Sequence, residues 1–182
     1  MPSKSKCVAF VERIRIENRR GGLSLMAMSL ERILVAAQGY IELEMAGEAL
    51  AELDSLGAKE RDREEVLQLR LFVLMRGRLW SQALGICERF RLIFPEGSTG
   101  YVHGAFCLHE LGRTSEAREI LLSGPPSLTR EATYFYNLGC YDAVLGNLDE
   151  ATASLRMSFE MDNKFREIAK YDPDLKSVSG LL

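Results

Sequence analysis

The sequence predicts an all-α protein, an α-solenoid of about four antiparallel helix pairs closed by a short C-terminal capping helix. Three observations predict this class: a single internal period, small residues at fixed places within it, and turn signals between the two helices of each pair. The period is marked by four alanines, each 34 residues after the last, namely Ala49, Ala83, Ala117 and Ala151. The repeats contain no sustained two-residue alternation of the kind that predicts strands.

Four further columns of residues share the spacing of the alanines. A Glu or Gln precedes each alanine, and an apolar residue follows four positions later. Small or apolar residues also stand twelve and sixteen positions earlier, which in the last repeat are Gly139 and Phe135. Small residues in both helices of a pair let the backbones approach closely, and the apolar residues around them fill the remaining space. The columns therefore indicate packed helix pairs.

Turn signals separate the helices of each pair. Gly77, Gly112 and Gly146 fall five or six residues before an anchor alanine. Prolines at position 95 and at positions 125–126 are expected to end second helices. The expected N-caps of the helices that follow the turns are Ser81, Thr114 and Asn147, the last with Glu150 in a capping box.

These signals give the predicted elements in order. The four pairs are expected at 30–43 with 47–56, 62–76 with 81–94, 99–111 with 115–122, and 130–145 with 148–161, followed by a short helix at 164–170. The repeat domain is expected to span 29–182, with units 30–60, 61–97, 98–128 and 129–163 and a cap at 164–182.

The first 28 residues stand apart as a basic segment. Six Lys or Arg residues face only two Glu within positions 1–22. A poorly ordered tail is the favoured interpretation; a basic arm for nucleic acid and a true translation start at Met26 or Met28 are the alternatives.

The repeat columns resemble the tetratricopeptide repeat (TPR) family. In the fourth unit Phe135, Leu138, Gly139, Gly146 and Ala151 stand where the motif has its aromatic residue, Leu-Gly pair, turn glycine and alanine. The second unit has its turn glycine one residue early, and the first has Glu where that glycine is expected. The ending through positions 171–175 resembles a terminal variant of these repeats. The resemblance covers roughly residues 29–176 and implies a helical repeat protein that binds other proteins.

Composition bounds the remaining possibilities. A net charge of −3 is too small to argue for a nucleic-acid or membrane partner. The four cysteines are dispersed, without the spacing of a disulfide framework or a CxxC pair. No secretory signal or membrane-spanning stretch is recognisable. We therefore expect reduced thiols and a cytoplasmic location.

Candidate chemistry is sparse. His103 and Cys107 are spaced i, i+4, but a zinc site needs further N or S ligands in paired spacings, so we expect packing and no metal. Asp172 and Asp174 flank Pro173, and we expect Asp174 to cap a turn. No nucleophile, P-loop or dinucleotide-binding pattern occurs, so we expect no enzyme activity and no cofactor.

The first helix of each pair is expected to line a concave groove. The residues at the repeat spacing on that wall are mostly apolar and aromatic. TPR proteins that bind acidic peptide C-termini resemble one another in placing Lys, Arg and Asn there, and this basic clamp is absent. The alternative is that some of these residues pack on the neighbouring repeat or on the N-terminal arm. The predicted groove residues are Gln38, Phe72, Met75, Phe106, His109, Tyr136 and Cys140.

The sequence thus predicts an adaptor or chaperone-like protein that binds an apolar peptide or helix in its groove. One alternative is a self-associating structural protein, a homodimer without a separate client. Another is a regulatory subunit whose partner carries out the chemistry.

Overall fold

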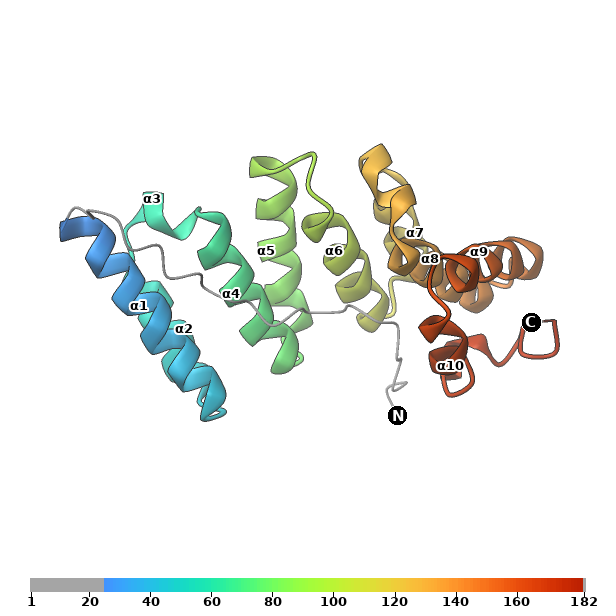
Figure 1. Ribbon diagram of the computed structural model, residues 1–182, viewed down its shortest axis with the longest axis horizontal. Coiled ribbons are helices and arrows are strands. Elements are labelled where there is room, and N and C mark those ends of the chain that lie inside the picture. The colour runs from blue at the N-terminus through green and yellow to red at the C-terminus, as the bar shows by residue number, and fades with distance from the viewer. Residues whose placement is uncertain (1–24, 182) are drawn as a thin grey trace. The chain divides into compact units, whose positions relative to one another are not determined.

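A computed structural model describes residues 25–181 of the chain, and within this range it is helical and contains no β-strand (Figure 1). Residues 1–24 of the expected basic segment lie outside the described residues. The predicted helix pairs are all present, with ends within a few residues of those expected. In order, the elements are α1 (Leu25–Glu42), α2 (Ala46–Asp54), α3 (Ala58–Arg61), α4 (Glu64–Arg76), α5 (Trp80–Ile93), α6 (Thr99–Glu110), α7 (Thr114–Leu122), the 3-10 helix η1 (Pro126–Arg130), α8 (Ala132–Leu145), α9 (Leu148–Met161), α10 (Lys164–Ala169) and the 3-10 helix η2 (Pro173–Leu175).

The described residues divide into two compact units, 25–93 and 94–181, called here the N-terminal and C-terminal units. In the N-terminal unit α1 packs on α2, α4 packs on α5, and α2 and α1 both contact α4. In the C-terminal unit α6 packs on α7, α8 packs on α9, and α8 also contacts α6, α7, η1 and η2. Each unit therefore contains two of the predicted helix pairs.

All four turns between paired helices have the same backbone geometry. In each, an N–H after the turn donates to a carbonyl five residues back at 2.9 Å, and the preceding N–H donates to a carbonyl three residues back. This is the Schellman arrangement, which ends a helix by satisfying its last carbonyls. The bonds that span five residues run from the N–H to the carbonyl oxygen of Met45 and Tyr40, Leu79 and Leu74, Arg113 and Leu108, and Asn147 and Asp142.

The Schellman turn needs one residue with a positive φ. Gly112 and Gly146 supply it with φ of 76° and 85°, as the sequence predicts. At the equivalent positions of the first two pairs Glu44 has φ 60° and Arg78 has φ 55°. Gly77, expected to make the second turn, has φ −75° and an ordinary right-handed conformation. The backbone thus keeps the 34-residue period even where the sequence departs from it.

Side-chain capping contributes less to these turns than expected. Asn147 occupies an N-cap position but makes no side-chain cap bond, because its Nδ2 donates to Asp142 Oδ1 at 2.8 Å. Thr114 is the first residue of α7, and Ser81 lies inside α5, so neither is an N-cap. The cap predictions were wrong because the backbone bonds of the Schellman turn already fix where the next helix begins.

The anchor alanines lie where the helices of each pair meet. All four have no exposed surface. The backbone N–H of each donates, at 2.9–3.1 Å, to the carbonyl oxygen of the residue that follows the positive-φ position of the turn. The apolar residues four positions later are equally buried, including Leu121 and Leu155 in the C-terminal unit. Gly139 of α8 marks a close approach to α9, since a Cβ there would lie 2.6 Å from Leu155 Cγ and 3.2 Å from the Ala151 carbonyl oxygen. The prediction of small residues at a helix crossing is confirmed at this position.

Each unit has its own apolar core. In the N-terminal unit it is formed by Leu30, Leu34, Ala37, Leu53, Leu56, Val66 and Leu69. In the C-terminal unit the short α10 and the turns after it bring Phe165, Leu175 and Val178 into the interior, each at most 1% exposed. The residues after the last pair therefore form part of the core, as expected of a cap. None of the described helices combines the length and hydropathy that crossing a membrane requires.

Candidate functional site

The predicted groove residues of the N-terminal unit lie on α1 and α4. Gln38 and Phe72 are partly exposed, whereas Met75 is 7% exposed and belongs to the core. The guanidinium carbon of Arg76 lies 5.7 Å from the centre of the Phe72 ring, a cation–π contact. Of these three residues, Gln38 and Phe72 expose part of their surface.

The predicted groove residues of the C-terminal unit are buried. Phe106 of α6 is 8% exposed, and Tyr136 and Cys140 of α8 have no exposed surface. His109, at the end of α6, is 9% exposed and lies with its ring centre 5.1 Å from that of Tyr141. These side chains do not form the open apolar wall that the sequence suggested.

Three of these residues instead bind the chain's own turn at positions 172–174. The Tyr136 hydroxyl donates to Asp172 Oδ2 at 2.9 Å, and Cys140 Sγ lies 3.8 Å from the same oxygen. His109 Nε2 lies 3.1 Å from Asp174 Oδ2, and His109 Nδ1 lies 3.0 Å from the Thr114 hydroxyl. Because an ionised carboxylate only accepts hydrogen bonds, Nε2 donates to Asp174. The turn therefore occupies polar groups that the sequence had assigned to a ligand.

The roles of the two aspartates differ from those expected. Asp172 is the N-cap of η2 and accepts from the backbone N–H of Asp174 at 3.1 Å, whereas Asp174 bonds His109. Burial raises the pKa of Asp172 above its ordinary value of 3.8, and the hydrogen bonds from Asp174 and Tyr136 oppose that rise. The expectation that Asp174 caps the turn was wrong because the cap must precede the first helical N–H.

Two polar residues that the sequence analysis did not assign to the groove have buried side-chain atoms on the first helices of the C-terminal unit. Asn137 of α8 has no exposed surface, and neither its Nδ2 nor its Oδ1 finds a hydrogen-bond partner among the described residues. His103 of α6 has a buried Nδ1 that is likewise without a partner within the described chain. The two residues are 34 positions apart, so they occupy equivalent places on helices that contact each other. The repeat spacing is the sequence signal that connects them, although by itself His103 suggests only a possible metal ligand.

The surroundings of His103 keep its ring neutral. Burial lowers the pKa of His103 from 6.5 to about 4. Cys107, one turn further along α6, is fully buried. The described residues contain no group of three or more His, Cys, Asp or Glu that is placed to hold a metal ion. A neutral ring offers one donor and one acceptor, which suits hydrogen bonding to an uncharged polar ligand.

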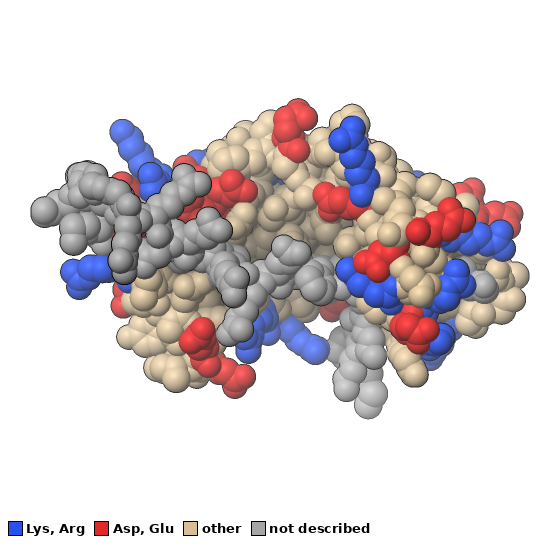
Figure 2. All heavy atoms as spheres, viewed as in Figure 1, with Lys and Arg blue, Asp and Glu red and all other residues tan. Residues whose placement is uncertain are grey.

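Two arginines on the second helices of their pairs form ion pairs within their own units. Arg89 Nε donates to Asp62 Oδ1 at 2.8 Å, and Arg118 Nε donates to the buried Asp142 at 2.7 Å. On the face drawn in Figure 2, the blue and red side chains of the C-terminal unit are intermixed, and neither sign prevails. Arg89 and Arg118 are therefore held in ion pairs within their own units.

Comparison with solved structures gives the same architecture. A structure described as MamA 41-end from Desulfovibrio magneticus RS-1 matches with a TM-score of 0.69 at 14% identity, over 79% of this chain and 81% of its own. A structure described as MamA RS-1 ArsTM double mutant has a TM-score of 0.65 at 15% identity, over 74% and 76% of the two chains. One described as MamA MSR-1 C2 has 0.63 at 15% identity, over 78% and 82%.

At these identities the likeness shows the fold alone. Together with the helix pairs, it confirms the predicted all-α fold of TPR-like repeats. No known family profile and no curated protein sequence matches the chain. The TPR resemblance is therefore shown for the fold and not for membership of the family.

Proposed function

We propose that this chain is a protein-binding module, an adaptor or chaperone-like protein without catalytic activity, that holds a peptide segment on the first helices of its C-terminal unit. The observation that carries the proposal is that three buried side-chain atoms at repeat-equivalent positions, His103 Nδ1 and the Nδ2 and Oδ1 of Asn137, have no hydrogen-bond partner among the described residues. A buried polar atom without a partner costs about 1–3 kcal/mol. Functional sites are where a fold retains such a cost.

The chemistry of these groups matches a peptide main chain. Each residue of an extended peptide presents one N–H and one C=O, and an asparagine amide can donate to one while accepting from the other. The neutral His103 ring can do the same. Phe106 stands three residues after His103 on the same face of α6 and is 8% exposed. Because Asn137 is fully buried, a ligand reaches it only after its cover moves, so binding includes a local rearrangement.

The test uses Asn137→Leu, which keeps the approximate volume and removes both polar atoms. Peptides selected from a randomised display library on the unaltered chain should bind the variant at least about tenfold more weakly, the loss of one good anchor contact. The same variant should gain about 1 kcal/mol in stability to urea, because an unpaired polar group has been removed. Phe106→Ala is a poorer probe, since truncating a side chain that is 8% exposed also disturbs the core.

The matched control is Ser158→Ala. Ser158 of α9 is also fully buried, and its hydroxyl finds no partner among the described residues, but it lies on the second helix of its pair. The control should leave peptide binding unchanged. A library that yields no binder, or equal binding by Asn137→Leu and the unaltered chain, would contradict the proposal.

Self-association is the second candidate. The turn between α8 and α9 exposes Val144, Leu145 and Leu148 by 46%, 40% and 37%, and α9 exposes Met157 and Met161 by 45% and 41%. Contiguous exposed apolar surface is a feature of protein interfaces. Sedimentation across a hundredfold range of concentration distinguishes this candidate, because Leu145→Ser should abolish any dimer if the turn mediates it.

A further inference from the structure

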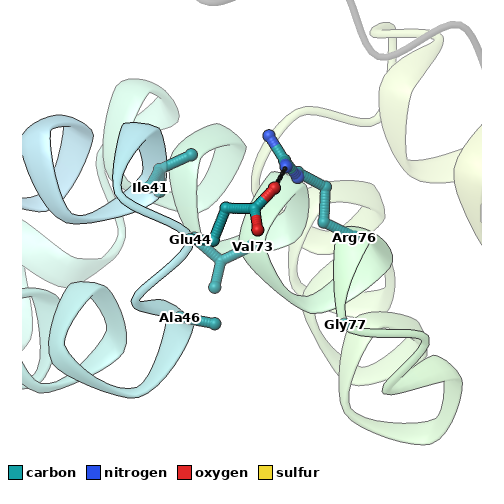
Figure 3. A pocket seen from close by; sticks show the side chains of 6 residues that line it. All are labelled: Ile41, Glu44, Ala46, Val73, Arg76 and Gly77. Atoms are coloured by element: carbon teal, nitrogen blue, oxygen red, sulfur yellow. Dashed lines mark ion pairs between the residues drawn. The ribbon is translucent and has the colours of Figure 1, made fainter.

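A pocket of about 300 Å³ opens in the N-terminal unit, at the end where α1 turns into α2 (Figure 3). It lies between this turn and the last residues of α4. Aliphatic side chains form its wall, and an acidic and a basic side chain reach toward each other across it (Figure 3). The lining residues are Ile41, Glu44, Ala46, Val73, Arg76 and Gly77.

The repeat explains why this space is open. The positions 68 residues after Ile41, Ala46 and Val73 belong to the C-terminal unit and hold larger or more polar side chains. There, the rings at the equivalents of Ile41 and Val73 lie 5.1 Å apart, and the hydroxyl at the equivalent of Ala46 lies 3.0 Å from one of them. The equivalents are His109, Thr114 and Tyr141. In the C-terminal unit two rings thus pack together where the N-terminal unit has aliphatic side chains and an open pocket.

The size and lining of the pocket suit one aromatic ring. An aliphatic cavity of about 150 Å³ is enough to bind benzene. The present pocket has about twice that volume and is open to solvent on one side, so it admits a ring that enters on a side chain from outside. A ring also contributes a large buried area at a small cost in side-chain entropy.

The rim carries one acidic and one basic side chain. Arg76 Nη2 lies 3.5 Å from Glu44 Oε1, and the two side chains are 52% and 82% exposed. An exposed pair at this distance contributes little, about 0–1 kcal/mol, so a ligand carboxylate can replace Glu44 at small cost. The filled equivalent in the C-terminal unit also carries a carboxylate, that of Asp174, 3.1 Å from the His109 ring.

We propose that this pocket binds an aromatic side chain of a partner protein segment in which an acidic residue adjoins the aromatic one. The ring enters between Ile41 and Val73, and the carboxylate pairs with Arg76 in place of Glu44. The site lies wholly in the N-terminal unit, so it is independent of the peptide site proposed around Asn137.

The probes are three short blocked peptides, acetyl-Gly-Tyr-Asp-Gly amide and the same peptide with Ala for Tyr or with Asn for Asp. Binding is followed by the methyl NMR signals of Ile41 and Val73 during titration of the full chain. The Tyr-Asp peptide should shift both signals, the Ala-Asp peptide should shift neither, and the Tyr-Asn peptide should bind about three- to tenfold more weakly. Equal shifts with the Tyr and Ala peptides, or no shifts at all, would overturn the proposal.

Variants separate the pocket from the rim. Ala46→Trp places in the pocket the residue type found one repeat later at position 80, and should weaken binding of the Tyr-Asp peptide at least tenfold. Arg76→Gln should weaken it three- to tenfold, whereas Glu44→Gln should strengthen it because the competing carboxylate is gone. Arg63→Gln is the matched control, since Arg63 is 53% exposed and pairs with Glu65 at 3.4 Å in the same unit.

Unchanged binding in Ala46→Trp, with a helical spectrum like that of the unaltered chain, would refute the assignment of the pocket. If the Ile41 and Val73 signals depend on protein concentration without peptide, a second copy of the chain occupies the site, and that result also contradicts the proposal. Loss of peptide-library binding in Asn137→Leu with normal Tyr-Asp binding would show that the two sites are separate, as proposed.

Discussion

Replacing Arg78 by glycine should stabilise the protein, although it removes a charged side chain and adds nothing to any contact. Arg78 has φ 55° at the left-handed position of the second Schellman turn, and its side chain is exposed. The third and fourth turns have glycine at the equivalent position, with φ 76° and 85°. The substitution therefore gives the second turn the residue that its backbone geometry favours.

The magnitude follows from two opposing effects. A left-handed conformation costs an L-residue roughly 1–2 kcal/mol, and glycine removes that cost. Glycine has greater freedom in the unfolded chain, which costs about 0.5–1 kcal/mol on folding. The expected gain is therefore about 0.5–1 kcal/mol, which corresponds to a few degrees in melting temperature for a chain of this size.

The assay is urea unfolding followed by tryptophan fluorescence. Trp80 is the single tryptophan of the chain and begins α5, two residues after Arg78, so its signal reports on the N-terminal unit. Arg78→Ala is the control, because it removes the same side chain and keeps a Cβ in the left-handed conformation. The midpoint should rise for Arg78→Gly and not for Arg78→Ala.

The reverse substitutions complete the test. Gly112→Ala and Gly146→Ala should each lower stability by a similar amount, and a Cβ at either position would meet no atom within 4 Å. Their cost would then be conformational, with no contribution from a clash. If Arg78→Gly and Arg78→Ala unfold at the same urea concentration, the strain argument for this turn is wrong.

Two further predictions concern packing and pH. Gly139→Ala should lower stability by about 1–3 kcal/mol, because the new Cβ would lie 2.6 Å from Leu155 Cγ. Gly85→Ala in α5, where a Cβ meets nothing within 4 Å, should instead raise stability by about 0.5–1 kcal/mol. Thermal melts followed by circular dichroism compare the two variants. His103 has a folded pKa of about 4 and an unfolded value of 6.5, so its contribution to stability is complete above pH 6.5 and is lost as the pH falls toward 4. The loss should reach about 3 kcal/mol, because each unit of pKa shift corresponds to about 1.4 kcal/mol. His103→Gln should abolish this part of the pH dependence in urea unfolding, and an unchanged pH profile would show that the ring is not desolvated.

The sequence by itself determined the helix pairs and their period. A helix is specified by residues three and four apart, and a pair by two such patterns joined by a short turn, so every signal lies within about 34 residues of its partner. Repetition then confirmed each local pattern four times over. The helix crossing at Gly139 could be predicted for the same reason, because a glycine in a column of small residues indicates that two helix backbones approach closely there.

What became of the predicted groove residues was decided only by the tertiary structure. His109, Tyr136 and Cys140 occupy wall positions by the repeat, but the turn at 172–174 returns to α8 and takes up their polar groups. That turn lies after the last repeat, so no periodicity connects it to α6 or α8. The unpaired state of Asn137 was equally unreadable, because it depends on every neighbour within hydrogen-bond distance.

The left-handed turns of the first two helix pairs and the pocket are further features that the sequence alone did not predict. Glu44 and Arg78 do not look like turn residues, yet both adopt positive φ, because packing of the paired helices fixes the turn and local preference yields by about 1–2 kcal/mol. The pocket at Ile41 and Val73 lies where the N-terminal unit has aliphatic side chains and the C-terminal unit has rings. Local spacing specifies helices because helical contacts are local, whereas an empty volume or an unpaired atom is a property of all the surrounding segments together.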